Sequence, residues 1–280
     1  MGKKGTVTLD RWGAFEPAHS PCASKGPWYY VDTEGIVVDF LTDEKAAQSL
    51  LPPDLEVAEP ASAFVTIVYN NWSTIGAYGE AYLGINCTFK GEPCAFIPAV
   101  YTTGVASRII AREVYGCGKK TAERIEVTNH ADGDIQALME IKQGDRAAAI
   151  VMRPAENVSA EALGPHQFIP LIFLKTFPDP EGGDTPLSAQ LISQPYPMQP
   201  HVDAAGRSII YSGPGHLVFG WPSDLQVPIL GGLSFKFCRF DSVLEYGKVL
   251  KTYTAAEFAA AKKAAKPGQA TAKPRAKKKR

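Results

Sequence analysis

The sequence predicts an α+β protein that is rich in strands: a closed or half-closed antiparallel barrel with few helices. Many short runs of β-branched and aromatic residues follow one another at short spacing, and few segments have a helical pattern. No internal repeat and no convincing linker interrupts residues 25–254. We therefore expect a single domain over 25–254, an extended arm at 1–24, and a basic, disordered tail at 255–280.

The first elements expected in the domain are a strand, a helix and a group of longer strands. Gly35–Phe40 is short and β-branched. Thr42 is expected to cap a helix over Asp43–Leu51, which Pro52-Pro53 stops. The strand-like runs that follow are Ala63–Tyr69, Tyr78–Phe89 and Ala95–Thr102.

The second half of the domain is expected to hold one more helix and then mainly strands. A helical pattern covers Ala106–Tyr115, and Gly116 is expected to end it. The apolar segment Gly164–Lys175 fits either a helix or a strand, and Asp241–Tyr253 is expected as the last element before a short helix at Ala255–Ala265. The other strands are expected near Glu123–Thr128, Ile135–Lys142, Ala147–Met152, Gln190–Ser193, Ser208–Ser212, His216–Gly220 and Leu233–Phe240.

Composition narrows the class of protein. The 280 residues are 45% apolar, which suffices for a large buried core. No apolar run of about 18 residues predicts a membrane span, and no signal-peptide core follows Met1. The five cysteines have no CxxC spacing, and the five histidines include no pair typical of a zinc site. We therefore expect a cytoplasmic protein with reduced thiols and with neither a metal nor another cofactor.

The net charge of zero hides an asymmetry between the body and the tail. Residues 255–280 contain nine Lys/Arg and one Glu, whereas the remaining chain contains 20 basic and 28 acidic side chains. Beyond Pro267 the tail cannot bury enough apolar surface to offset its chain entropy. Such a tail could tether an acidic partner or nucleic acid, but no aromatic residues interleave its charges. A solvated tail is therefore favoured, and nucleic acid is not expected as a partner.

One segment, from Arg112 to Lys120, invites three chemical hypotheses. A phosphate-binding loop is excluded, because Glu113 and Lys120 occupy the positions that need a glycine and a Ser/Thr. A reactive cysteine is a second hypothesis, since Cys117 lies beside two lysines that would lower its pKa, although no nearby histidine offers a base. The third hypothesis is an amine nucleophile at Lys119.

A lysine attacks a carbonyl only when its amine is unprotonated. The reference pKa is about 10.4, and lowering it to about 7 takes roughly 4–5 kcal/mol. Burial and an adjacent cation can both supply this bias. Lys120 offers the cation, and neighbours such as Tyr115 and Cys117 could help to exclude water. Lys-Lys pairs are nevertheless common as solvated surface charge, so the pair alone is weak support.

A longer pattern gives the pair more weight, because the chain resembles the acetoacetate decarboxylase superfamily from about Lys25 to Tyr253. The active-site segment of that family resembles Arg112-Glu113, five residues, and then Lys119-Lys120. Further matches, in the same order, are Lys25-Gly26-Pro27 before Trp28-Tyr29-Tyr30, Thr42-Asp43, Leu51-Pro52, the Glu56 and Glu59-Pro60 region, Tyr78-Gly79-Glu80, and Ser212-Gly213-Pro214 before His216-Leu217. Acetoacetate decarboxylase is itself the known example of a lysine activated by desolvation or by a neighbouring cation.

The resemblance implies roles for particular residues. Lys119 matches the Schiff-base nucleophile, Lys120 its neighbour and Glu80 the active-site glutamate. The substrate pocket is expected to include Tyr78, Tyr82, Thr33 and Val65. The family also implies a small keto acid as substrate and a homo-oligomer as the assembly.

The strand that carries Glu80 allows two interpretations. Side chains alternate along a strand, so Glu80 shares one face with Tyr78 and Tyr82, whereas the opposite face, which includes Leu83 and Ile85, is apolar. If the apolar face is turned to the core, Glu80 is exposed. In a barrel with a polar cavity, Glu80 instead lines the site, and the family match favours this second interpretation.

Two departures from the family pattern leave the reaction open. Thr33 stands where the decarboxylase has an arginine, and Val65 stands where it has a second active-site glutamate. Schiff-base formation is still expected. It could lead to decarboxylation of a 3-oxo acid, or to aldol addition and dehydration with a 2-oxo acid such as pyruvate. The substrate is then not expected to be acetoacetate itself. The alternative is a non-catalytic barrel of the same fold that binds a small molecule.

Overall fold

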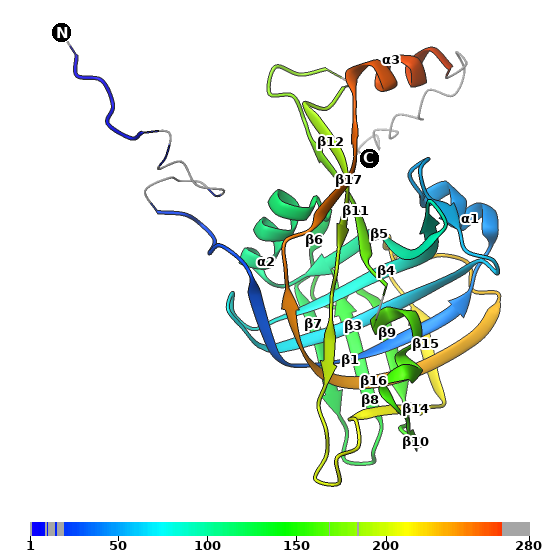
Figure 1. Cartoon of the computed structure of the whole chain (residues 1–280). Coiled ribbons are helices and arrows are strands. Elements are labelled where there is room, and N and C mark those ends of the chain that lie inside the picture. Colours follow the sequence, from blue (N-terminus) through cyan, green and yellow to red (C-terminus); the bar gives the residue numbers. More distant parts are fainter. Residues whose placement is uncertain are drawn as a thin grey trace, which may run out of the picture.

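The computed structural model describes residues 2–8, 10, 15, 20–167, 169–183 and 185–264, and its described part is dominated by one large and one small sheet (Figure 1). The large sheet has 13 strands, nearly all antiparallel to their neighbours. Its main path is β10 (Glu156–Asn157), β14 (Ile210–Gly213), β16 (Gly231–Leu244), β1 (Trp28–Leu41), β3 (Ser62–Ser73), β4 (Tyr78–Phe89), β5 (Glu92–Thr102), β11 (Leu171–Phe177), β12 (Ser188–Gln194) and β17 (Lys248–Tyr253). Three short strands pair beside this path: β2 (Glu56–Val57) on β4, β6 (Lys119–Thr121) on β5, and β13 (Met198–Pro200) on β16.

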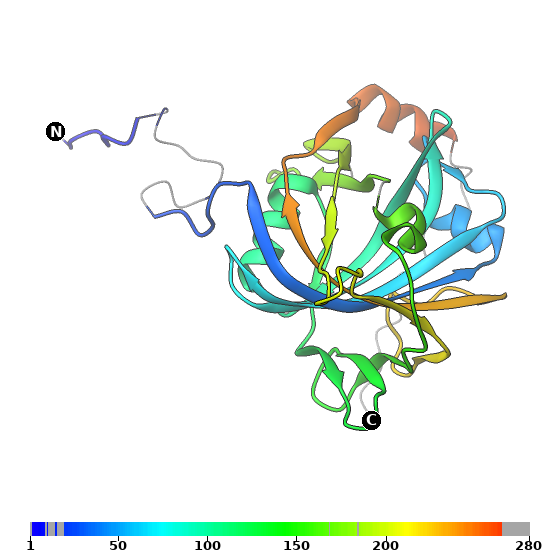
Figure 2. The same ribbon diagram turned by 60° about the horizontal axis from the view of Figure 1, so that its bottom comes forward.

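The large sheet is strongly curved but open. Its long strands β1, β3 and β4 bend across the molecule in Figure 2, and the helices and β17 lie above them. The hydrogen-bonded path ends at β10 on one side and at β17 on the other, and no pairing between described strands joins these ends. The prediction of a β-rich protein with few helices is confirmed, but the closed form of the barrel is not.

The small sheet packs on one face of the large one and forms the main core with it. Its order is β15 (Gly215–Phe219), β9 (Arg146–Met152), β8 (Ile135–Glu140) and β7 (Arg124–Asn129). Alternate side chains of the long strands, such as Ile67 on β3 and Leu83 on β4, are fully buried in this core. Each such side chain contributes about 1.5–3 kcal/mol by burial. The opposite face of these strands is thereby left for the site.

The two helices of the domain follow the predicted pattern with one change at a cap. Helix α1 (Glu44–Leu50) is capped by Asp43, whose Oδ1 accepts from the Ala46 amide at 2.8 Å, rather than by Thr42 as predicted. The Thr42 hydroxyl instead donates to the Pro228 carbonyl oxygen at 2.7 Å. Helix α2 (Val105–Ile110) continues as a π-helical turn, η2 (Ala111–Tyr115).

Gly116 ends this second helix, as predicted. Its φ of +77° lies in the left-handed region that favours glycine. A Cβ atom at this position would also lie 2.1 Å from the Lys175 Cα atom of β11. The glycine therefore fixes both the end of the helix and its close approach to β11.

Two predicted segments are each divided between two elements of the structure. The segment at 164–175 is divided between a 3₁₀ helix, η3 (Ala160–Gln167), and β11. The expected last element, Asp241–Tyr253, is divided between the end of β16 and β17, and α3 (Ala255–Ala264) follows as predicted. Much of the predicted arm, and the tail from residue 265 on, lie outside the described residues. None of the helices in the described ranges is long and apolar enough to cross a membrane.

Candidate active site

A compact cavity lies against the face of β1, β3 and β4 that is turned away from the main core. The volume of the cavity is about 60 Å³. Most of the lining is aromatic or aliphatic, and the charged groups on it are one lysine and one glutamate. The lining residues are Tyr30, Val68, Asn70, Tyr78, Glu80, Tyr82, Ile97, Val100, Ala111, Tyr115, Cys117, Lys119, Leu171, Phe173, Gln194, Tyr196, Phe240 and Leu244.

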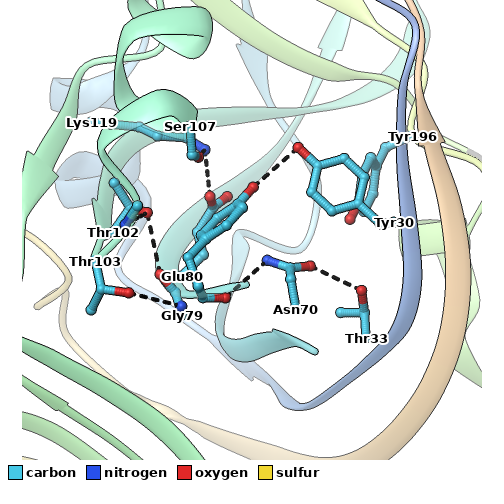
Figure 3. Close-up of polar contacts among 12 residues, drawn as sticks. Tyr30, Thr33, Asn70, Gly79, Glu80, Thr102, Thr103, Ser107, Lys119 and Tyr196 are labelled. Atoms are coloured by element: carbon cyan, nitrogen blue, oxygen red, sulfur yellow. Dashed lines mark hydrogen bonds and ion pairs between the residues drawn. The ribbon is translucent and has the colours of Figure 1, made fainter. Parts of the chain in front are cut away.

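Lys119 reaches this cavity from β6, which runs parallel to β5. The residue is 8% exposed. Its Nζ atom forms an ion pair with Glu80 Oε2 and donates a hydrogen bond to Ser107 Oγ at 2.8 Å (Figure 3). The same nitrogen lies 5.7 Å from the centre of the Tyr78 ring. The amine, which β6 carries, is thus held by side chains from two other elements, β4 and α2.

Glu80 faces the cavity because of the alternation along β4. Its neighbour Ala81 is fully buried in the main core, so Glu80 points to the opposite side. The preceding Gly79 anchors the backbone. Its amide donates to Thr103 Oγ1 at 3.0 Å, and its carbonyl oxygen accepts from Thr102 Oγ1 at 3.2 Å (Figure 3). Of the two interpretations of this strand, the geometry therefore agrees with the one in which Glu80 lines a cavity.

Burial and the neighbouring charges have opposite effects on the pKa of Lys119. Burial is the largest single effect and lowers the pKa of the Lys119 amine, but the Glu80 carboxylate, Cys117 and Tyr30 together raise it by more. The net pKa of Lys119 lies above its ordinary value. In the unliganded site the lysine is therefore an ammonium ion, and any nucleophilic step has to begin with the loss of a proton from it.

The other ionisable groups around the amine are neutral. Burial raises the pKa of Tyr30 and of Tyr78 well above the ordinary tyrosine value, and their hydroxyls are joined by a hydrogen bond of 3.1 Å. Burial also raises the pKa of the Cys117 thiol to about 12. A thiol with such a pKa is a poor nucleophile at neutral pH. The geometry thus favours Lys119 over Cys117 as the reactive group of this segment.

Lys120 does not reach the cavity. Consecutive residues of a strand point to opposite faces, and Lys120 is directed outward, where its Nζ atom pairs with Asp224 Oδ2. The Lys120 side chain is 57% exposed. An exposed and paired ammonium group adds little to the potential inside the cavity. The expectation that Lys120 supplies the cation next to the reactive amine therefore has no support in the geometry.

Two further expected pocket residues lie behind the cavity wall. Val65 is fully buried in the main core, because it shares the face of β3 that carries Ile67. Thr33 is also fully buried, and its hydroxyl donates to Asn70 Oδ1 at 2.9 Å (Figure 3). Asn70 is the residue that lines the cavity here. The expected pocket positions of Thr33 and Val65 are thus corrected, whereas Tyr78 and Tyr82 do line it.

Sequence reasoning missed several groups of the site. Ser107, which contacts the amine, lies in the expected helix, on the same face as the cavity residue Ala111 four positions later. That spacing was the available signal. Gln194 and Tyr196 come from β12 and the loop after it, and no motif in the sequence marks them. Within the described ranges, no cluster of His, Cys, Asp and Glu side chains could hold a metal ion.

Comparison with known proteins agrees with this fold. A sequence profile of acetoacetate decarboxylase (ADC) matches residues 16–254. The acetoacetate decarboxylase of Chromobacterium violaceum is 26% identical over 242 residues, which cover 85% of this chain and 94% of that relative. A crystal structure of acetoacetate decarboxylase from Legionella pneumophila superposes with a TM-score of 0.70 at 26% identity, over 81% of this chain and 88% of that one.

The fold also resembles that of a more distant enzyme. The enduracididine biosynthesis enzyme MppR, solved in complex with pyruvate, superposes with a TM-score of 0.69 at 19% identity, over 90% of this chain and 100% of that one. Fold, cavity and profile together define an acetoacetate decarboxylase-like enzyme. The chain belongs to the acetoacetate decarboxylase family.

Proposed function

We propose that this protein is a carbon–carbon lyase that forms a Schiff base between Lys119 and a small keto acid. The observation that carries the proposal is the buried Lys119 amine, which contacts Glu80 and Ser107 at a cavity of about 60 Å³. A cavity of this size suits a small substrate. Among the described residues that line this cavity, Lys119 is also the only amine.

The ion pair itself provides the first step. Glu80 takes a proton from the Lys119 ammonium, and the neutral amine attacks the ketone carbon of the substrate. The carbonyl π bond breaks, and one proton of the attacking nitrogen passes to the oxygen, which gives the carbinolamine. Burial favours the transfer from Lys119 to Glu80, because it turns two buried charges into two neutral groups. The carbinolamine then loses its hydroxyl as water, with the proton supplied by Glu80, and an iminium remains. No second cation has to lower the pKa of Lys119, which fits the outward position of Lys120.

The iminium can lead to either of two reactions. In a 3-oxo acid, the bond to the carboxylate breaks, its electron pair moves to the iminium nitrogen, and carbon dioxide leaves. In a 2-oxo acid, Glu80 removes a proton from the carbon next to the iminium, and the resulting enamine adds to an aldehyde. The charged groups that line the cavity are Lys119 and Glu80. Since no arginine and no second carboxylate occurs among the described residues that line the cavity, we propose that acetoacetate is not the specialised substrate.

The test is reductive trapping. The protein is incubated with acetoacetate or pyruvate and treated with borohydride, and the position of the adduct is read by peptide mass spectrometry. An adduct on Lys119 that is absent from Lys119→Met but present in Lys120→Met supports the proposal. Carbon dioxide release from acetoacetate, and enone formation from pyruvate with an added aldehyde, then separate the two reactions. Failure of every keto acid to form an adduct would refute it.

A second candidate is a non-catalytic cavity that binds a small molecule, and one observation favours it. The pKa of Lys119 is raised by Glu80, so the resting amine is charged. A charged amine binds a carboxylate without reacting. The two candidates differ in the trapping experiment, because this candidate predicts keto acid binding by calorimetry without any reduced adduct.

A further inference from the structure

Ser107 is the second group that touches the reactive nitrogen. It lies on α2, is 2% exposed, and accepts a hydrogen bond from Lys119 Nζ at 2.8 Å. The same nitrogen forms an ion pair with the Glu80 carboxylate, which lies beside it in Figure 3. Both acceptors therefore remain within reach of the nitrogen while its bonding changes.

The number of N–H donors falls during the proposed reaction. A lysine ammonium group has three N–H donors, which suffice for Glu80 and Ser107 together. The iminium nitrogen keeps a single N–H, because two of its bonds go to the substrate carbon and one to the lysine side chain. From that point, Glu80 and Ser107 compete for one donor. The outcome decides whether Glu80 is occupied or available for the substrate.

We propose that Ser107 is a catalytic residue that accepts the hydrogen bond of the Lys119 iminium N–H and thereby leaves Glu80 free to move protons at the substrate carbon. This inference rests on the proposed Schiff-base function. A serine hydroxyl is neutral and has no proton-transfer role to lose by holding the N–H, whereas a carboxylate held by the N–H is a weaker base. The fixed N–H also sets the plane of the C=N bond, which determines which substrate proton faces Glu80.

The surroundings of Ser107 suit this role. Its neighbour Ala111, one helical turn later, lines the cavity, so the helix presents small side chains to the site. The Ser107 hydroxyl already accepts a hydrogen bond from Lys119 Nζ, so Ser107 needs no movement to accept the iminium N–H. The centre of the Tyr78 ring lies 5.7 Å from the same nitrogen, and the Tyr78 side chain also has a hydrogen-bonding interaction with Ser107, which helps to fix the serine hydroxyl beside the amine.

The experiment separates adduct formation from proton transfer, with pyruvate in D₂O as the probe. For Ser107→Ala we expect a borohydride-trapped adduct on Lys119 within about threefold of the wild-type amount, and methyl hydrogen–deuterium exchange slowed about 10- to 100-fold. Ser107→Thr keeps the hydroxyl and should restore most of the exchange. Ser107→Cys, which is nearly isosteric but a weak acceptor, should behave like Ser107→Ala and covers the case in which the alanine variant does not fold.

A second buried hydroxyl provides the control for the Ser107 variants. Thr42→Val deletes another buried hydroxyl, at the far end of β1, and should leave the exchange unchanged. Exchange in Ser107→Ala and Ser107→Cys within threefold of the wild type would overturn the role of Ser107. So would a parallel loss of adduct and exchange, since Ser107 would then act in forming the Schiff base. If the wild-type protein forms no adduct, the proposed function itself fails.

Discussion

Lys119 and Glu80, which lie 39 positions apart in the sequence, form a buried ion pair at the wall of a small cavity. Lys119 comes from the short strand β6 and Glu80 from the long strand β4, and β5 lies between these two strands in the sheet. The pair holds the amine as an ammonium ion next to the base that can deprotonate it. Activation of the lysine is therefore expected to come from proton transfer inside the pair.

Removal of the carboxylate should separate nucleophilicity from turnover. In Glu80→Gln the main cause that raises the pKa of Lys119 is gone, and burial then lowers that pKa. The amine should therefore become neutral at a lower pH than in the wild type. Borohydride trapping should persist near neutral pH, whereas turnover falls about 10²- to 10⁴-fold, as expected for a lost general acid–base. An unchanged pH profile for trapping would contradict this coupling.

Substitution of the neighbouring lysine should have little effect. Lys120→Met removes an exposed ion pair with Asp224, which contributes about 0–1 kcal/mol to the free energy of unfolding. Turnover is expected to remain within about threefold of the wild type. Steady-state kinetics and a urea titration measure both effects. A loss of tenfold or more in turnover would restore to Lys120 the role that the sequence pattern suggested.

The two glycines around Cys117 should respond differently to alanine. At Gly116, with its φ of +77°, a Cβ would lie 2.1 Å from the Lys175 Cα atom, whereas at Gly118 it meets no atom within 4 Å. Gly116→Ala should lower the free energy of unfolding by about 2 kcal/mol or more and displace Lys119. Gly118→Ala serves as the matched control and should cost less than about 1 kcal/mol. Equal stability of the two variants in urea would refute the steric argument.

Acid should weaken one contact that ties β17 to the turn after α1. Asp54 accepts hydrogen bonds from Lys251 Nζ at 2.8 Å and from the Tyr253 hydroxyl at 2.7 Å. Burial raises the pKa of Asp54, but the contacts with Lys251 and Tyr253 together lower it by more. The net pKa of Asp54 therefore lies below its ordinary value. A carboxyl group with a lowered folded-state pKa contributes stability above its unfolded pKa of about 3.9 and loses that contribution as the pH falls through the folded value.

Asp54→Asn tests this contribution. Because the group is partly exposed, the variant should be less stable than the wild type by about 0.5–1 kcal/mol at pH 7. The difference should shrink as the pH falls below about 4, because Asp54 is protonated first in the unfolded chain and only at lower pH in the folded protein. Urea titrations of both proteins at pH 7 and pH 3 give the comparison. A difference that stays constant with pH would assign the effect to packing rather than to charge.

The sequence predicted local structure better than it predicted which side chains converge. Period-two alternation put Glu80, Tyr78 and Tyr82 on one face of β4, and this face does line the cavity. The closure of the barrel could not be predicted, because it depends on pairing between distant strands such as β10 and β17. The same holds for the cap of α1, where two adjacent polar residues competed and Asp43 reached the Ala46 amide.

Errors at the site arose where position in the sequence was taken for position in space. Adjacent residues of a strand face opposite ways, so Lys120 lies outside although it follows Lys119. Val65 likewise lies on the core face of β3, and Asn70 stands between Thr33 and the cavity. Ser107 was missed because its spacing to Ala111 indicates a shared helix face but not which strand that face meets. Resemblance to a family points to Lys119, but the contacts around it come from the fold.

The central claim is that the Lys119 amine itself bonds to the substrate carbonyl. Borohydride reduction in the presence of pyruvate or acetoacetate, followed by peptide mass spectrometry, measures this most directly. We predict a mass increase of one reduced keto acid, or of its decarboxylated product, on the peptide that contains Lys119, and no such increase in Lys119→Met. Unmodified Lys119 after reduction with a saturating panel of keto acids, or an adduct that persists in Lys119→Met, would contradict the account.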